Sequence, residues 1–387
     1  MTAIENEPQS LTLQEQEWVD QFMDETTLFL GPDREIMRSH SISERSVYED
    51  ACIAKGVDRV TVERIRKRIA GALDEGYEMC EAQGAAPGAK WGDLTTAIYT
   101  AAGDVSYLSC HGVIAFSAIL HHPIRYIMKY WKDEPTVGIH EGDGFIHNDA
   151  RFGNVHNTDQ SMIMPIIRDG DIIAWVAATI HEGENGACEP GGMPSGSETA
   201  FDDGLRMSPF KIVERGHLRR DLLTFLQHSV RDPKLQLADL KVKIASVRRI
   251  MERIDRLIDE VGVETFVAAL RVTIEDVDVE VRRRIGELSL AQDTVGEDVR
   301  RAAVAARLPV PTWAARDVRI PAVDARTGEV VVFTPGSGVE LVDAVTASCA
   351  VPGVWPPVTI GGNRYVDGGV RSSDNADYAA GFARVVV

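Results

Sequence analysis

Apolar side chains recur at helical spacing in several long segments of this chain. Between Val60 and Gln83 apolar residues recur at helical spacing, for example at Ile65, Ile69 and Leu73, as on one face of an α-helix. The same pattern predicts a long helical connector after residue 220. Helices are predicted over Leu11–Phe29, Val60–Gln83, His121–Lys132, Leu222–Val230, Leu235–Val261 and Phe266–Ile285.

Short apolar runs separated by turn residues occupy the middle of the chain. Met162–Ile167 and Ile172–Ile180 flank the turn signal Arg168–Asp171, a pattern that predicts a β-hairpin. Leu94–Ala118 alternates small and apolar residues and predicts sheet or a buried turn. The five glycines and two prolines of Gly183–Gly196 predict a loop. Together with the helices, these runs indicate an α/β fold that contains a mixed sheet module.

The chain changes character near Ile285, because residues 286–387 contain no Lys and no His. All ten His and nine Lys lie before that point. We therefore predict two domains, residues 1–285 and residues 286–387. In the second domain, helices are predicted over Val299–Ala306 and Leu341–Ala350, a strand pair over Val318–Val323 and Glu329–Phe333, and a hairpin over Gly361–Val370.

Composition and charge narrow the class of protein. A chain of 387 residues is long enough for two or three domains. The net charge of −18 disfavours a nucleic-acid or anionic-membrane partner. The five cysteines are dispersed without a C-x-x-C pair, which is typical of reduced thiols. We find neither a signal-peptide pattern nor an apolar run long enough to span a membrane, so a cytoplasmic protein is expected.

Candidate metal ligands gather between Gly142 and Ala200. His156 and Asp159 stand three residues apart, and His181 ends the second strand of the predicted hairpin. Two imidazoles and one carboxylate are a common ligand set for a catalytic divalent ion that keeps open coordination positions. The alternative is a hydrogen-bonded loop in which Asp159 caps a turn and His181 is buried in the sheet.

Other polar residues surround these three. His147 and Asp149 could orient the ligands, but a turn-stabilising role for Asp149 is an equal alternative. Glu182 and Glu184 are expected to be solvated and not catalytic. Cys188 is expected to be structural.

The motifs of residues 30–285 resemble the hydantoinase B/oxoprolinase family, and most resemble the alpha subunits of its acetone and acetophenone carboxylases. The resemblance covers the N-terminal half of such a subunit. The motifs occur in the expected order. The matching stretches are Gly142–Asp149, Gly153–Asp159, Pro190–Pro194, Asp203–Arg206 and Asp239–Arg249.

This resemblance implies a hetero-oligomer with a hydantoinase A-type subunit, which uses ATP, and a small third subunit. The implied reaction joins a ketone and bicarbonate into a β-keto acid with manganese as cofactor. His156, Asp159 and His181 match the manganese ligands, and the ion would act as a Lewis acid toward the enolate. We find no phosphate-binding glycine motif in this chain, so ATP would be used by the partner subunit.

Residues 286–387 resemble the C-terminal part of patatin-like phospholipases, through Ala347–Pro357 and Tyr365–Val370. That resemblance implies a catalytic dyad of Asp367 with a serine in a G-x-S-x-G elbow. No such elbow occurs in this sequence, so a role as a turn residue is favoured for Asp367. Two alternatives to the carboxylase therefore stay open: a patatin-like lipid acyl hydrolase without its nucleophile, and a non-catalytic fusion product.

Overall fold

The computed structural model describes residues 12–14, 16–17, 31–39, 42–372, 375 and 378. The helix predicted over Leu11–Phe29 falls largely outside these residues. The remaining predicted helices are all present, with ends that shift by a few residues. The described helices before residue 230 are α2 (Arg34–Arg38), α3 (Val47–Ala54), α4 (Arg59–Gln83), α5 (Pro87–Lys90), α6 (Ile114–Ile119), α7 (His121–Tyr126) with its π-helical extension η1 (Ile127–Trp131), η2 (Ala150–Phe152) and α8 (Arg220–His228).

A seven-stranded sheet forms the centre of the larger part of the molecule, in the order β2-β1-β5-β4-β3-β6-β7. The predicted hairpin is its longest pair, β4 and β5. The region predicted as sheet or buried turn became β1, β2 and then helix α6. The strands are β1 (Leu94–Thr100), β2 (Val105–Leu108), β3 (Gly144–His147), β4 (Asp159–Arg168), β5 (Asp171–His181), β6 (Phe210–Glu214) and β7 (His217–Leu218).

The mixed sheet predicted from the sequence is wrong, because every described strand pair is antiparallel. Short turns join β1 to β2, β4 to β5, and β6 to β7. A short turn returns the chain in the opposite direction, whereas a parallel pair needs a long crossover connection. The apolar content of the strands by itself did not distinguish parallel from antiparallel pairing.

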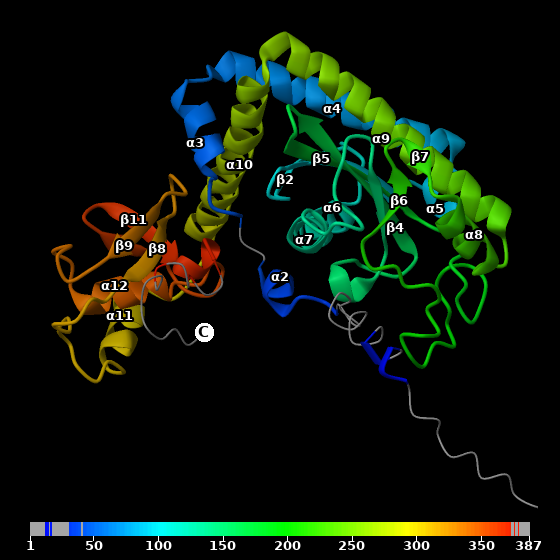
Figure 1. Ribbon diagram of the computed structural model, residues 1–387. Helices are drawn as coiled ribbons and strands as arrows, with labels where there is room; N and C mark the ends of the chain where they lie inside the picture. Colours follow the sequence, from blue (N-terminus) through cyan, green and yellow to red (C-terminus); the bar gives the residue numbers. More distant parts are fainter. Residues whose placement is uncertain are drawn as a thin grey trace, which may run out of the picture.

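Both faces of the seven-stranded sheet are covered, which explains why β5 is apolar at consecutive positions. Val176 and Ala178 belong to the core cluster under the long helices α4 and α9 (Pro233–Val261). Trp175 and Ala177 belong to a second cluster with residues of α7. Figure 1 shows α4 and α9 side by side over the sheet, with α6 and α7 on its other side. The amphipathic spacing of the helices therefore produced one layer of a three-layer arrangement.

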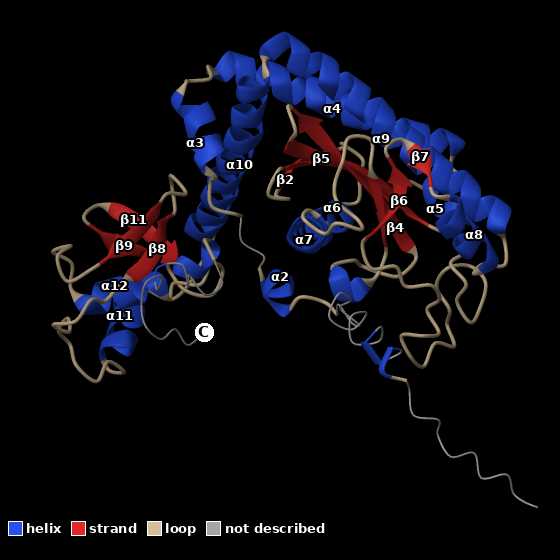
Figure 2. Cartoon of the chain, in the orientation of Figure 1, coloured by secondary structure: helices blue, strands red, loops and turns tan. Residues whose placement is uncertain are grey.

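Helix α10 (Val263–Ala291) leads from this sheet to a smaller C-terminal unit (Figure 2). It passes Ile285 without a break, and the predicted domain boundary there stays a prediction. Beyond it, a second antiparallel sheet has the order β10-β11-β8-β9. The elements of this unit are α11 (Glu297–Ala305), β8 (Ile320–Asp324), β9 (Val330–Phe333), α12 (Leu341–Ser348), β10 (Val358–Ile360), β11 (Asn363–Asp367) and η3 (Gly368–Val370).

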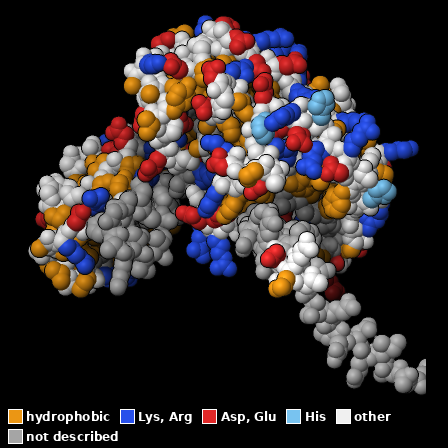
Figure 3. Space-filling model, in the orientation of Figure 1, with side chains coloured by type: hydrophobic (Ala, Val, Ile, Leu, Met, Phe, Trp, Pro, Cys, Tyr) orange, Lys and Arg blue, Asp and Glu red, His pale blue; other side chains and the backbone are white. Residues whose placement is uncertain are grey.

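The surface in Figure 3 carries acidic and basic side chains interspersed with one another. Hydrophobic side chains gather over α3 and α10, where Val47 and Val277 are exposed. None of the described helices is both long and apolar enough to cross a membrane.

Candidate metal centre

The β4–β5 hairpin brings two of the predicted ligands together. Asp159 is the first residue of β4 and His181 is the last residue of β5, and the two stand opposite each other in the strand register. His181 Nδ1 lies 2.7 Å from Asp159 Oδ1. Asp159 is completely buried. The pairing of the strands therefore fixes one carboxylate beside one imidazole.

The third predicted ligand comes from the loop before β4. His156 Nδ1 lies 2.9 Å from Asp159 Oδ2, and the His156 backbone N–H donates to the same oxygen at 3.0 Å. The rings of His156 and His181 are nearly perpendicular, with centroids 5.8 Å apart. One ligand atom from each of the three residues lies within 4.8 Å of the others. The three predicted ligands thus converge on one point.

Asn154 holds the loop that carries His156. Its side-chain amide donates to the carbonyl oxygens of Asn148 at 2.8 Å and Asp159 at 2.7 Å. The preceding Gly153 has a φ of +93°, and a Cβ there would meet the His122 side chain at 2.6 Å. Only glycine suits this backbone and this close approach. The hydrogen bonds of Asn154 and the close packing of Gly153 therefore fix the geometry of the loop that carries His156.

Exposure differs sharply between the ligands. The His156 side chain is 44% exposed, that of His181 14%, and that of Asp159 is fully buried. A bound ion would therefore be held from one side and open toward solvent beside His156, as a catalytic ion requires. The Asp159 carboxylate raises the pKa of the His181 imidazole, against the opposing effect of burial.

Asp93 is a neighbour that sequence reasoning missed. Its Oδ2 lies 3.6 Å from His181 Nδ1, and its backbone carbonyl accepts a hydrogen bond from His181 N–H at 3.0 Å. It directly precedes β1, which pairs with β5. Nothing in the local sequence marks it, because the contact depends on that long-range pairing.

The donor set fits a divalent metal ion. Two imidazole nitrogens and a carboxylate oxygen suit the first-row divalent ions, manganese among them. Among the described residues, buried polar atoms without a hydrogen-bond partner occur in the same loop, at Asn154 Oδ1 and Thr158 Oγ1. Such atoms are typical of sites that bind water or a ligand. The geometry therefore supports a divalent cation at this site.

Among the described residues, the side chains of His147 and Asp149 form no hydrogen bond or ion pair with the three proposed ligands, so the direct orienting contact considered for them is absent. His147, at the end of β3, is completely buried and its Nε2 lies 3.1 Å from the Gly153 carbonyl oxygen. Burial lowers the pKa of His147 to about 4. Asp149 accepts a hydrogen bond from Arg151 N–H at 2.9 Å and caps η2, so its predicted turn role is confirmed.

The prediction that Glu182 and Glu184 are solvated is wrong. Glu182 is completely buried and forms an ion pair with Lys243 of α9, and burial raises its pKa against the opposing effect of the Lys243 ammonium group. Glu184 is 5% exposed and lies 3.2 Å from Arg231. Both pairs join residues far apart in the sequence, so local composition could not reveal them.

A cavity of about 310 Å³ lies beside the metal ligands. His156 lines it, together with Arg151, Arg206 and the loop residue Met193. The Asp149 carboxylate lies 2.6 Å from the Arg151 guanidinium and neutralises it. Arg206 stacks on the Phe201 ring at 4.2 Å and makes no hydrogen bond or ion pair with the described residues. The cavity is thus lined by two arginines, and among the described residues Arg151 forms an ion pair whereas Arg206 does not.

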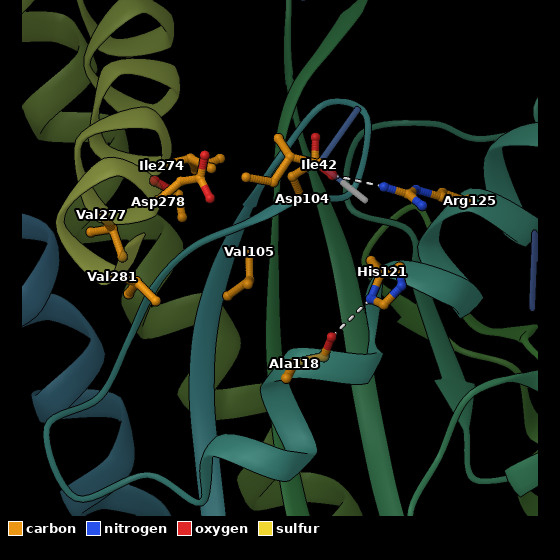
Figure 4. Close-up of a pocket in the computed structure, with 11 residues that line it drawn as sticks. Ile42, Asp104, Val105, Ala118, His121, Arg125, Ile274, Val277, Asp278 and Val281 are labelled. Carbon is orange, nitrogen blue, oxygen red and sulfur yellow. Dashed lines mark hydrogen bonds and ion pairs between the residues drawn. The ribbon is translucent and has the colours of Figure 1, made fainter. Parts of the chain in front are cut away.

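Figure 4 shows another cavity, of about 290 Å³, between β2, α7 and α10. Arg125 there pairs with Asp104 at 2.7 Å, and His121 Nδ1 lies 2.8 Å from the Ala118 carbonyl oxygen. On the α10 side, Val277 and Val281 line the cavity together with the carboxylate residue Asp278. Asp278 pairs with Arg282, which does not line the cavity, and the cavity shares no residue with the metal ligands.

Asp367 lies in the C-terminal unit, at the end of β11. Its carboxylate accepts a hydrogen bond from Gly369 N–H at 2.7 Å and caps η3. This is the turn contact expected for it, and its patatin-type catalytic role stays a prediction. Cys188 is a free, exposed cysteine.

The fold and the site define an α/β protein with antiparallel sheets, long helices and a candidate His-Asp-His metal centre. A sequence model of the Hydantoinase B/oxoprolinase family matches residues 58–327. The chain belongs to this family. The match extends beyond Ile285, and the comparisons give no support to a patatin-like part.

Individual relatives agree with this assignment. The chain is 34% identical over 239 residues to the acetophenone carboxylase delta subunit of Aromatoleum aromaticum, a match that covers 60% of this chain and 34% of the relative. It is 33% identical over 176 residues to the acetone carboxylase alpha subunit of Xanthobacter autotrophicus, covering 45% of this chain and 22% of the relative. The chain therefore spans about a third or less of these relatives.

A solved structure of nucleotide-free acetone carboxylase is similar in fold. The TM-score is 0.57 and the sequence identity 27%, and the similarity covers 60% of this chain and 30% of that chain. Both relatives are subunits of carboxylases. The acetophenone carboxylase relative is a delta subunit, whereas the motifs predicted a resemblance to an alpha subunit.

Proposed function

We propose that this chain is the metal-binding part of an ATP-dependent ketone carboxylase, which forms a β-keto acid from a ketone and bicarbonate. The observation that carries the proposal is the convergence of His156, Asp159 and His181 within 4.8 Å, in a chain related to acetone and acetophenone carboxylase subunits. The proposed reaction is the one that the names of those relatives give, and this chain spans only part of their length.

The proposed ligands are one nitrogen each of His156 and His181 and one carboxylate oxygen of Asp159, with manganese as the preferred ion. A divalent ion bound there would supply Lewis-acid stabilisation to a developing enolate oxygen. Buried Asp159 bridges the two imidazoles and fixes their orientation. The exposed edge of His156 leaves a side of the site accessible to substrate.

The neighbouring cavity supports a small, oxygen-rich substrate pair. Its volume of about 310 Å³ suits a ketone and bicarbonate better than a lipid chain. Arg206 is proposed to hold the bicarbonate oxyanion, because its guanidinium forms no ion pair with an acidic side chain among the described residues. The ketone would then occupy the part of the cavity between Met193 and His156.

The remaining chemistry is assigned to partner subunits. Activation with ATP would come from a hydantoinase A-type subunit, and a small third subunit would complete the hetero-oligomer. The isolated chain is therefore expected to hydrolyse no ATP and to carboxylate no ketone.

Metal analysis of purified variants tests the site. The wild-type chain, incubated with Mn²⁺ and then dialysed, should retain stoichiometric metal, and His156→Ala should fall to background. His217→Ala is a matched control, because His217 is an exposed histidine on β7. Stoichiometric metal in His156→Ala would refute the ligand assignment. Incorporation of labelled bicarbonate into ketone by the chain with its partner subunits and ATP tests the reaction.

A further inference from the structure

Helix α9 carries two charged side chains that are completely buried, and the helix packs against the β4–β5 hairpin that holds Asp159 and His181. Asp239 and Lys243 are both fully buried and stand four residues apart, so they share one face of the helix. Lys243 Nζ forms an ion pair with Glu182, which is equally buried and directly follows the proposed ligand His181. Burying an ion pair adds little to stability, because desolvation of both charges offsets their attraction. Its place beside a ligand points to another role.

Glu182 connects several segments of the site. Its backbone N–H donates at 2.9 Å to the carbonyl oxygen of Thr158, the residue before Asp159. Gly192, in the loop that follows β5, packs so closely that a Cβ there would lie 2.5 Å from the Glu182 carbonyl oxygen. The Glu182 side chain reaches α9 through Lys243. Moving Glu182 would therefore disturb the end of β5 and the loop that carries His156.

Asp239 holds the segment that leads into α5, and α5 packs against His181. Its carboxylate accepts hydrogen bonds from Ala85 N–H at 2.6 Å and Ala86 N–H at 2.9 Å. These residues lead into α5, where Gly88 packs against the carbonyl and Cβ of His181. One turn of α9 thus reaches His181 from two directions.

We infer that Lys243 is a positioning residue for the metal centre, whose ammonium group fixes Glu182 and through it the adjacent ligand His181. The inference rests on the proposed function, since it assigns a role toward the ion that His181 is proposed to hold. Groups that orient a ligand without touching the metal change metal affinity about 10- to 100-fold when they are removed.

The test uses the full chain with Co²⁺ as a spectroscopic probe. Lys243→Met removes the ammonium group and keeps an unbranched side chain of similar length. Lys241→Met is the matched control, because Lys241 is an exposed lysine on the same helix. Calorimetric titration should show about 10- to 100-fold weaker Co²⁺ binding for Lys243→Met and wild-type binding for Lys241→Met. The visible Co²⁺ spectrum at saturation should change only in Lys243→Met, because it reports the arrangement of the ligands.

A double variant separates positioning from stability. Lys243→Met alone leaves Glu182 buried without its counter-charge, which destabilises the fold. Lys243→Met combined with Glu182→Met removes both charges, so thermal unfolding should return toward the wild-type temperature while Co²⁺ binding stays weak. A double variant with wild-type Co²⁺ affinity and spectrum would overturn the inference and leave the proposed function intact. A wild-type chain that binds no metal would overturn both.

Discussion

The contact between α5 and His181 gives a sharp test of how the fold supports the site. Gly88 lies in α5, and a methyl group there would clash with the His181 carbonyl oxygen and lie 2.9 Å from its Cβ. That separation is about 0.6 Å less than the usual carbon–carbon contact of about 3.5 Å. We therefore expect Gly88→Ala to push the end of β5 away from α5.

The magnitude follows from two opposing effects. Overpacking of a well-packed contact costs about 1–3 kcal/mol, and the higher helix propensity of alanine returns about 0.5–1 kcal/mol. The net expectation is a loss of about 1–2 kcal/mol in the free energy of unfolding. Displacing a ligand by more than about 0.5 Å also disturbs a metal site, so metal affinity should fall at least about tenfold.

Gly71→Ala is the matched control for this change. Gly71 lies inside α4, and a Cβ there would meet no atom within 4 Å. The same substitution should therefore stabilise the chain by about 0.5–1 kcal/mol and leave metal affinity unchanged.

Urea unfolding of the metal-free chain measures the stability of each variant, and calorimetric titration with Mn²⁺ measures the affinity. The reasoning is refuted if Gly88→Ala is as stable as Gly71→Ala and binds Mn²⁺ like the wild type. A loss of stability with unchanged affinity would confirm the clash but contradict its link to His181.

Three further predictions concern the cavity, the buried histidine and the C-terminal unit. In the assembled complex, Arg206→Gln should raise the KM for bicarbonate about tenfold with little change in kcat. Arg151→Gln should raise the KM less, because Asp149 already neutralises Arg151. Equal increases in KM would contradict the role of Arg206. Burial lowers the pKa of His147 to about 4, which is below its value in the unfolded chain. The unfolded chain therefore binds more protons at low pH, and the free energy of unfolding should fall by up to about 3 kcal/mol as the pH drops from 6.5 to 4. His147→Gln should flatten the pH dependence of urea unfolding in that range, and an unchanged slope would argue against the lowered pKa. Residues 286–387 should not react with a fluorophosphonate probe, because no serine elbow accompanies Asp367; stoichiometric labelling of a serine there would revive the patatin-like alternative.

The local pattern of the chain was sufficient to predict the long helices, the β4–β5 hairpin and the three candidate ligands, but not the short elements such as α3, β3 and β6. The apolar runs on either side of Arg168–Asp171 predicted the hairpin, and that hairpin sets Asp159 opposite His181. His156 follows because it lies only three residues before Asp159. Contacts between neighbours in sequence depend on turn chemistry and periodicity, which a single sequence carries.

Tertiary structure decided the surroundings of the ligands and the type of sheet. Asp93 reaches His181 only because β1 pairs with β5. Glu182 meets Lys243 across 61 residues of chain, and only because α9 docks on the sheet. A carboxylate has the same local signature whether it is solvated or paired in the interior, so its burial depends on which distant cation the fold brings to it. The antiparallel direction of the strands likewise depended on the short turns that join them, and not on the apolar content of the strands.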